Sequence, residues 1–357
     1  MIDNSKGWGG AEEVLSTLAR GLNERGHHVT VFAREGAGTV DTFRRAGLDV
    51  RTIARQGIGL VGGMLSLARM VRRERFDLIH VHRNHDLPAG KIAALAAEAP
   101  LLLTQHCLLG KSSPFLMGLA DRIVAVSRFI GDDMERRFPS LAGRVEVVHN
   151  GIDLRPFENP RQGYWQSVSE VAGCWPLLGV IGYFYKNQEE LIDLMPRIRE
   201  HLPKAMLIII GHDDSKWESL HQHVRERGAV DMVHFAGRIA RDRIADAMAG
   251  LDFNVSAFRR EGCALNVIES LAVGTPFIGY RAGSYPELVK DGETGALAAN
   301  GDGFVQALAS LSTDSGRLDR LRERARQDAG DRFAVGRMID AYEHHYRSLV
   351  KGAHGER

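Results

Sequence analysis

The sequence predicts an α/β protein built from two doubly wound domains, each with a parallel β-sheet. Three observations lead to this fold class: the length of the chain, its alternation of short apolar strands with longer amphipathic segments, and one interruption of that alternation near the middle. At 357 residues the chain exceeds what one hydrophobic core usually serves. Strands that alternate with helices form βαβ units, whose strands lie parallel in one sheet.

The composition indicates a globular protein without an electrostatic bias. Hydrophobic residues make up 44% and charged residues 25%, which excludes general disorder. The 46 basic and 45 acidic residues nearly cancel, so a nucleic-acid partner is not expected. The 3 cysteines fit no zinc or disulfide framework, which indicates a reducing compartment. No apolar run reaches the roughly 18 residues of a membrane helix. We expect a cytoplasmic protein that could also associate peripherally with the inner membrane.

The first half of the chain contains short apolar segments separated by amphipathic ones. Amphipathic helices are expected over 12–24 and 63–75. Only Met1 to Asn4 precede the first glycine-rich turn, so we expect at most a stub of the first strand. We also expect that the in-frame codons upstream of Met1 encode a short apolar run. The predicted strands are 28–33, 78–82, 101–104, 123–126 and 145–148.

The alternation pauses over 156–176, which carries three prolines and no sustained period, and then resumes. We interpret this segment as a linker and domain boundary. The expected domains are 1–155 and 156–330, followed by a C-terminal helix within 331–357. Strands are predicted over 177–182, 205–211, 233–235, 253–255 and 276–279, and helices over 188–201, 264–273 and 335–351.

Ligands of such sheets bind beyond the carboxyl ends of the strands, where both halves carry glycine-rich turns. The first turn includes Gly9 and Gly10 and opens a helix. Glycines allow the backbone to approach an anion closely, and the free amides at a helix start favour phosphate. No Gly-Lys-Ser/Thr follows, so this is not a Walker motif. A tight turn without a ligand remains an alternative.

The most specific motif runs from Arg260 to Pro276, with Glu261 and Glu269 separated by seven residues. Glu261 is expected on the loop after a strand, and Glu269 early in the following helix. A diphosphate could bind the helix N-terminus between the two carboxylates, each of which could accept hydrogen bonds from hydroxyl groups. This arrangement suits a nucleotide-sugar. The alternative is a helix with an N-terminal charge and a solvated face.

The chain resembles the retaining, family 4 glycosyltransferases of GT-B fold over nearly its whole length. Each motif is common by itself, but their order is not. The matching segments are Gly9-Gly10-Ala11-Glu12, Asp77 to His82, Thr104-Gln105-His106, Ala125-Val126-Ser127, Asn150-Gly151-Ile152-Asp153, Glu261 through Pro276, and Pro286 through Gly295.

The resemblance implies two Rossmann-like domains that face each other across a cleft, with a final helix that returns to the first domain. It also implies a nucleoside-diphosphate sugar donor, retention of anomeric configuration and no metal or other cofactor. Glu261 would hold the sugar hydroxyls and Glu269 the ribose, while His106, Gly9 and Gly10 would reach the donor from the first domain. The phosphates would meet the backbone near Gly262, Cys263, Ala264 and Leu265.

One departure from the family concerns the loop that opens the second domain. The family has Gly-Arg and then, a few residues later, Lys-Gly; here Gly182 is followed by Tyr183, and Lys186 comes sooner. Lys186 is the expected phosphate cation. A tyrosine supplies no bidentate positive fork, so compensation by Arg238, Arg259 or Arg260 is expected. The same departure keeps open a non-catalytic nucleotide-sugar-binding subunit that partners an active homologue.

The remaining features have structural interpretations. His80 and His82 are expected to be buried strand residues, with a metal role only if a third ligand converges. Arg72, Arg73 and Arg75 are expected to end a solvated helix, with a membrane-touching patch as the alternative.

The resemblance, taken with the motifs, predicts a glycosyltransferase that acts on a glycan or lipid-linked glycan, in bacterial surface polysaccharide synthesis. Another GT-B enzyme class, an epimerase or a phosphorylase, is the further alternative.

Overall fold

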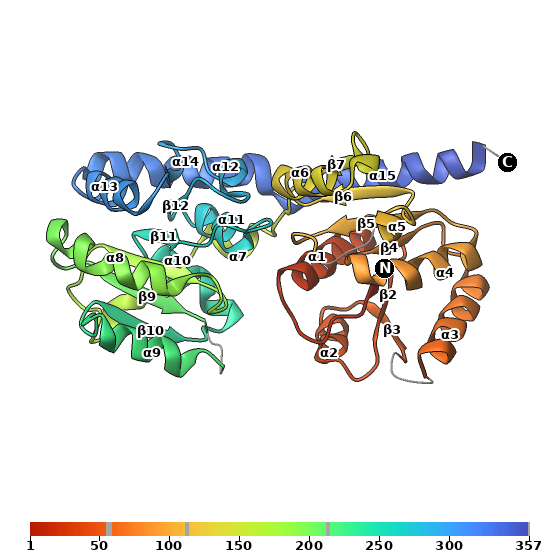
Figure 1. Cartoon of the computed structure of the whole chain (residues 1–357), viewed down its shortest axis with the longest axis horizontal. Coiled ribbons are helices and arrows are strands. Elements are labelled where there is room, and N and C mark those ends of the chain that lie inside the picture. The colour runs from red at the N-terminus through yellow and green to blue at the C-terminus, as the bar shows by residue number, and fades with distance from the viewer. Residues whose placement is uncertain (55–58, 111–113, 212–214, 356–357) are drawn as a thin grey trace. The chain divides into compact units, whose positions relative to one another are not determined.

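The computed structural model describes residues 1–54, 59–110, 114–211 and 215–355. It forms two compact units, one made of Met1–Ile152 with Val335–Arg357 and the other of Asp153–Ala334 (Figure 1). The sequence placed these divisions after 155 and after 330. Each unit is an α/β layer structure with its own parallel sheet, so the predicted fold class is confirmed.

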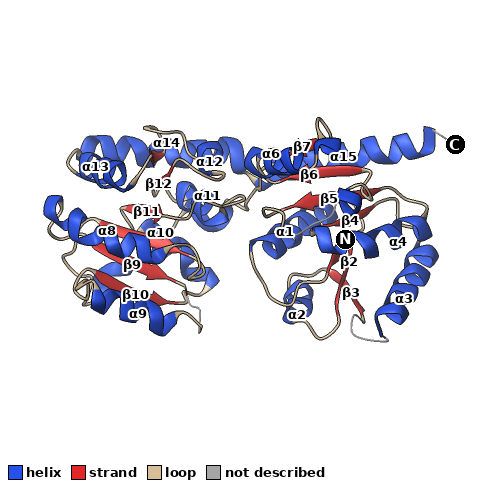
Figure 2. Cartoon of the chain, in the orientation of Figure 1, coloured by secondary structure: helices blue, strands red, loops and turns tan. Residues whose placement is uncertain are grey.

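The first unit contains a 7-stranded sheet in the order β3-β2-β1-β4-β5-β6-β7. All its strand pairs are parallel. Helices cover both faces of this sheet (Figure 2). The strands are β1 (Ile2–Asp3), β2 (Thr30–Arg34), β3 (Asp49–Ile53), β4 (Ile79–Val81), β5 (Leu101–Gln105), β6 (Arg122–Ala125) and β7 (Val145–Val147).

The helices of the first unit bury an apolar stripe on the sheet and expose their charges. In α1, for example, Leu15 and Ala19 are fully buried and pack against Val31 and Phe43. The helices are α1 (Gly10–Glu24), α2 (Gly38–Arg45), α3 (Gly59–Glu74), α4 (Leu87–Ala97), α5 (Pro114–Met117), α6 (Arg128–Arg137) and α15 (Val335–Gly355), with short 3₁₀ turns η1 (Asn84–Asp86) and η2 (Pro139–Leu141).

The final helix, α15, packs on the first unit beside α1. Its apolar face holds Met338, Ile339 and Tyr342, all nearly fully buried. The Tyr342 hydroxyl lies 2.9 Å from Thr104 Oγ1 of β5. The resemblance implies this return to the first unit, and the apolar residues spaced along one face of the helix are the ones buried there.

The second unit contains a 6-stranded parallel sheet in the order β10-β9-β8-β11-β12-β13. Its strands are β8 (Leu177–Ile181), β9 (Met206–Ile210), β10 (Val233–Gly237), β11 (Phe253–Ser256), β12 (Phe277–Tyr280) and β13 (Gly295–Ala298). Its helices are α7 (Arg155–Glu158), α8 (Gln188–His201), α9 (Trp217–Glu226), α10 (Ile244–Ala249), α11 (Leu265–Ala272), α12 (Tyr285–Leu288), α13 (Gly301–Ser312) and α14 (Ser315–Phe333), with 3₁₀ turns η3 (Tyr164–Ser167) and η4 (Arg241–Arg243).

The prediction that 156–176 is a linker is wrong. This segment belongs to the second unit and packs on it. Trp165 is 3% exposed, and its indole N–H donates to the carbonyl of Ala247 at 2.8 Å. A buried tryptophan with a satisfied N–H ties a segment firmly to a core, even where prolines and glycines prevent regular secondary structure.

The first strand is short, as expected. β1 consists of Ile2 and Asp3 and lies between β2 and β4, with Ile2 opposite Phe32 and Val81. Two strands were not predicted: β3, at the edge of its sheet and partly exposed, and β13, which consists of small residues. In the described part of the chain, no helix combines the length and the apolar character needed to cross a bilayer.

Candidate functional site

Most of the predicted donor residues of the second unit follow the neighbouring strands β8 and β11, on the loops at their carboxyl ends and in α11; Arg238 follows β10. Asn266, in the first turn of α11, links the two loops by donating from Nδ2 to the carbonyl of Ile181 at the end of β8, at 2.7 Å. The N-terminus of α11 is therefore held beside the loop that carries Lys186. This edge is where parallel sheets of this type bind ligands.

Lys186 and Glu261 form an ion pair at this edge. The Lys186 Nζ lies 2.8 Å from Glu261 Oε2, and the two side chains are only 17% and 16% exposed. The lysine loop is fixed by buried Gln188, which accepts from the Lys186 amide at 3.0 Å and donates to the Tyr183 carbonyl at 2.7 Å. The fold thus places an ammonium and a carboxylate together at the carboxyl edge of the sheet.

The backbone of Glu261 is held by the loop that follows β12. The Ser284 amide donates to the Glu261 carbonyl at 3.0 Å. Gly283 precedes it with φ +58, and a Cβ at this position would lie 3.0 Å from both the amide nitrogen and the carbonyl oxygen of Glu261. Glycine is therefore required by the left-handed backbone and by the close approach of the two loops. The carboxylate of Glu261 is positioned by main-chain contacts rather than by a free loop.

The helix start between the two glutamates is suited to an anion. Ala264 is the N-cap of α11, and among the described residues no side chain caps this helix. The backbone around Gly262, Cys263, Ala264 and Leu265 lies at the positive end of the helix dipole. Cys263 and Ala264 are buried, so their contribution to a ligand would come from the main chain.

Glu269 is buried in α11 and forms an ion pair with an arginine that the sequence did not predict as a site residue. Arg241, in η4, places Nη1 2.7 Å from Glu269 Oε1. The Glu269 side chain is 6% exposed, whereas that of Arg241 is 59% exposed. Arg241 and Glu269 are 28 residues apart in sequence, and no local pattern connects them. The ion pair therefore orients the Glu269 carboxylate within α11.

The three arginines proposed to replace the missing family arginine differ in their contacts. The guanidinium of Arg259 binds both carboxylate oxygens of Glu190, at 2.6 and 2.7 Å, and lies 3.9 Å from the centre of the Tyr280 ring. Arg259 lowers the pKa of the Glu190 carboxyl, and burial raises the pKa of Tyr280 to about 12. Arg238, after β10, and Arg260, beside Glu261, are both exposed. The prediction that Arg259 could compensate is therefore not favoured by the geometry.

In the first unit, the glycine-rich turn is held by a buried acidic residue. The amide of Gly9 donates to Glu12 Oε2 at 2.8 Å, and Gly10 is the first residue of α1. The other oxygen of Glu12 pairs with Arg83, which follows β4. Arg83 was not predicted as a site residue, although it directly follows the segment that ends in His82. It connects the turn to the carboxyl end of β4.

Asp3 completes this cluster and carries a perturbed pKa. Burial raises the pKa of the Asp3 carboxyl from 3.8 to about 6, against the effect of two hydrogen bonds from Ser5. Glu12 raises the pKa of Asp3 further, while Arg83, 3.7 Å away, lowers it. Between pH 3.8 and about 6, the folded protein therefore keeps a proton on Asp3 that the unfolded chain releases.

This pKa predicts a pH-dependent effect of Asp3→Asn on stability. Because the folded-state pKa is raised, ionisation opposes folding, and wild-type stability should fall as the pH rises from about 4 to about 6. The asparagine side chain does not titrate. As the pH rises, the free energy of unfolding of the variant should therefore increase relative to that of the wild type, by about 3 kcal/mol over the whole window and by about half of that between pH 5 and 7.5. Urea unfolding of both proteins at these pH values measures the difference. Parallel pH profiles would contradict the assignment.

His106 follows β5 and lies beside two buried histidines, His80 of β4 and His82 directly after it. Its Nε2 is 3.1 Å from Nδ1 of His82, and the two rings stack with centroids 5.4 Å apart. Burial and the charge of Arg83 lower the pKa of His106 to about 3. The described residues include no group of three or more His, Cys, Asp or Glu that could hold a metal ion. His80 and His82 are 1% and 2% exposed, so the expected burial of both is confirmed.

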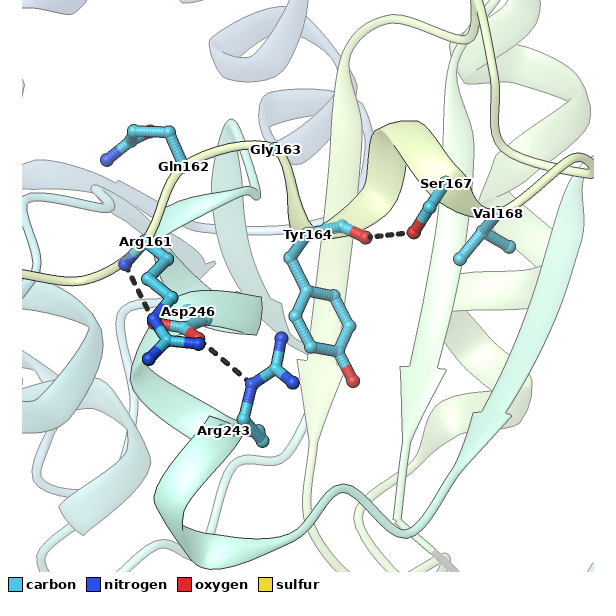
Figure 3. A pocket seen from close by; sticks show the side chains of 8 residues that line it. All are labelled: Arg161, Gln162, Gly163, Tyr164, Ser167, Val168, Arg243 and Asp246. Atoms are coloured by element: carbon cyan, nitrogen blue, oxygen red, sulfur yellow. Dashed lines mark hydrogen bonds and ion pairs between the residues drawn. The ribbon is translucent and has the colours of Figure 1, made fainter.

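A separate cavity of about 410 Å³ lies between η3 and α10 of the second unit and contains none of the predicted site residues (Figure 3). Asp246 accepts from the Arg161 amide at 2.7 Å and from Arg243 Nε at 3.0 Å. The Arg243 guanidinium lies 5.4 Å from the centre of the Tyr164 ring. Arg243 is two residues from Arg241 but has its own, separate set of contacts.

Comparisons with known proteins match both units. The model "Glycosyltransferase Family 4" matches residues 8–155, and "Glycosyl transferases group 1" matches residues 181–328. The chain is 26% identical to D-inositol 3-phosphate glycosyltransferase 2 of Catenulispora acidiphila, over 90% of this chain and 86% of the relative. It is 25% identical to the 2-deoxystreptamine N-acetyl-D-glucosaminyltransferase of Streptomyces fradiae, over 97% and 92%.

Among solved structures, HepE of Anabaena in complex with UDP and glucose superposes with a TM-score of 0.82 at 22% identity, covering 98% of each chain. Two family models in the expected order, with relatives aligned over most of both chains, agree with the motifs and with the two parallel sheets. The chain belongs to the family 4 glycosyltransferases of GT-B fold, enzymes that transfer glycosyl groups.

Proposed function

We propose that this enzyme transfers a sugar from a nucleoside-diphosphate donor, with retention of anomeric configuration, to a glycan or lipid-linked glycan. The observation that carries the proposal is the pair of carboxylates on either side of the α11 N-terminus, each held by a cation: Glu261 by Lys186 and Glu269 by Arg241. A diphosphate at the helix start would have hydroxyl-bearing groups on both sides, and each carboxylate can accept from such hydroxyls.

The residues have distinct roles in this proposal. Lys186 exchanges Glu261 for the departing diphosphate, whose growing charge it stabilises together with the backbone of 262–265. Glu261 then accepts from the sugar hydroxyls beside the breaking bond, and Glu269 accepts from the ribose. Gly9, Gly10 and His106 act from the first unit. A donor phosphate oxygen takes the proton of the acceptor, so no protein base is assigned.

A nucleotide-sugar screen tests the donor. At a hundred times its dissociation constant, a ligand should stabilise the protein by about 2.7 kcal/mol, which a thermal melt detects. The solved neighbour HepE was crystallised with UDP and glucose, so UDP-sugars are screened first. Donor hydrolysis without acceptor separates an enzyme from a binding subunit, and NMR of the product linkage tests retention. Stabilisation by no nucleotide-sugar would overturn the proposal.

Transfer should be insensitive to chelators. Lys186 and the N-terminus of α11 supply the positive charge that a divalent cation would otherwise provide to the diphosphate. Activity measured after EDTA treatment and desalting should therefore equal that of the untreated enzyme, with and without added Mg²⁺ or Mn²⁺. A loss of activity that only a divalent cation restores would refute this assignment of the leaving-group charge.

The acceptor class is proposed from the first unit and from the relatives. Arg72 and Arg73 at the end of α3 and Arg75 just after it are exposed, whereas Leu67 of this helix is fully buried. Leu65 of the same helix is 52% exposed, so the solvent-facing side of α3 carries an apolar side chain as well as basic ones. Such a surface would suit an anionic, lipid-linked acceptor at the bacterial inner membrane, in surface polysaccharide synthesis. The names of the relatives mention inositol phosphate and 2-deoxystreptamine, so an acceptor screen includes these cyclitols beside lipid-linked glycans.

A further inference from the structure

Three imidazoles form a ladder along the carboxyl ends of β4 and β5. His80 lies on β4 and His82 directly follows that strand; the two residues are two apart in the chain, and their ring centroids lie 4.1 Å apart. His82 in turn stacks on His106. Both nitrogens of His80 have hydroxyl partners: Nδ1 is 2.8 Å from the Tyr346 hydroxyl, and Nε2 is 2.8 Å from Thr104 Oγ1. Hydroxyls can donate or accept, so His80 is satisfied in either tautomer.

His82 is satisfied at only one nitrogen. Its Nδ1 bonds His106 Nε2 at 3.1 Å, whereas its Nε2 is buried and has no hydrogen-bond partner among the described residues. The residue is 2% exposed. Burial lowers the pKa of His82 well below its ordinary value, and Arg83 lowers it further. Both rings of the His82–His106 pair are therefore neutral at pH 7, with one N–H each.

Only two proton arrangements are compatible with this bond. In the first, His82 Nδ1–H donates to His106 Nε2, so His82 buries an unpaired lone pair and His106 carries its proton on Nδ1. In the second, His106 Nε2–H donates, and His82 buries an unpaired N–H. A buried N–H without a partner is rarer in proteins than a buried acceptor without one. The first arrangement is favoured.

We propose that His82 is a positioning residue. It does not contact the substrate, and its hydrogen bond to His106 holds the His106 ring in the tautomer that is protonated on Nδ1. This inference rests on the proposed role of His106 towards the donor sugar. Its consequence is that His106 presents a hydrogen-bond donor to a sugar oxygen, rather than a lone pair to a sugar hydroxyl. His82 also fixes the ring plane of His106 by stacking.

Nitrogen NMR of the histidine-labelled protein tests the tautomer without any substrate. Long-range proton–nitrogen correlations should identify His106 with its proton on Nδ1 in the wild type. His82→Phe keeps an aromatic ring against His80 but removes the donor, so His106 should move towards the Nε2–H form. His82→Asn places an amide N–H near the position of Nδ1 and should restore the Nδ1–H form. A wild-type His106 in the Nε2–H form would overturn the proposal.

Kinetics provide the second readout. His82→Phe should lower turnover by about tenfold, the value of one neutral hydrogen bond, and His82→Asn should recover most of it. Tyr346→Phe is the matched control, because it removes the hydroxyl partner of His80 at the other end of the ladder and leaves the His82–His106 bond in place. It should change neither the His106 tautomer nor turnover. If His82→Phe alters neither, the proposal is wrong.

The two readouts also separate this inference from the proposed function. If the wild type shows the Nδ1–H tautomer but transfers no sugar from any nucleotide donor, the hydrogen-bond assignment stands and the function fails. If transfer is found and the tautomer is Nε2–H, the function stands and the role of His82 fails.

Discussion

Glu261→Ala should reduce turnover by about 10²- to 10³-fold, the loss typical of removing one preorganised electrostatic contact at a reaction centre. Glu261 lies on the loop after β11, its carbonyl accepts from the Ser284 amide, and its Oε2 is 2.8 Å from Lys186 Nζ. Contacts beside the breaking bond strengthen as charge develops, so their loss lowers turnover more than donor binding.

Steady-state kinetics with varied donor measure the effect. Glu261→Gln keeps the shape and one acceptor oxygen, and should retain part of the lost turnover. Glu293→Ala, an exposed glutamate of the same unit, is the control for a general loss of negative charge. Thermal melts confirm folding, since the alanine variant leaves Lys186 without its carboxylate. Unchanged turnover in a folded Glu261→Ala protein would remove this residue from the reaction.

The sequence predicted local features of the fold well and contacts between distant segments poorly. Helix α8 was predicted over the residues that it occupies, 188–201, because its apolar period is clear and its first turn is acidic. β3 was missed because it is an edge strand with Asp, Arg and Thr, and one-sided burial leaves no apolar run. The segment 156–176 was read as a linker because turn residues conceal the anchoring of Trp165 in the core.

In the candidate site, too, local features could be predicted and distant contacts could not. Glu261 and Glu269 could be predicted because both belong to one continuous motif, a loop followed by the start of a helix, with seven residues between them. The sequence also nominates Lys186 as a phosphate cation, but not its ion pair with Glu261, which is 75 residues away, nor the contact of Arg241 with Glu269 from η4. Arg259 is one of three arginines that the sequence offers in place of the missing family arginine. The fold directs it to Glu190 and Tyr280 instead.

Glu269→Ala should raise the Michaelis constant of the donor by about ten- to a hundredfold, at about tenfold per 1.4 kcal/mol of lost hydrogen bonding, with turnover little changed. Ribose contacts are alike in the ground state and the transition state, so their loss weakens binding without affecting the chemical step.

Arg241 orients the carboxylate of Glu269. The Glu269 side chain is 6% exposed, and its Oε1 lies 2.7 Å from Arg241 Nη1, so this fixed orientation contributes to its affinity for a hydroxyl. Arg241→Ala should therefore act in the same direction as Glu269→Ala but with a smaller effect, because the carboxylate remains and loses only its fixed geometry. Arg243→Ala is the matched control, since this arginine lies in the same 3₁₀ turn but contacts Asp246 and Tyr164. Donor-dependent kinetics of the three variants decide the assignment: a fall in turnover for Glu269→Ala, or an equal effect of Arg243→Ala, would show that Glu269 does not bind the ribose.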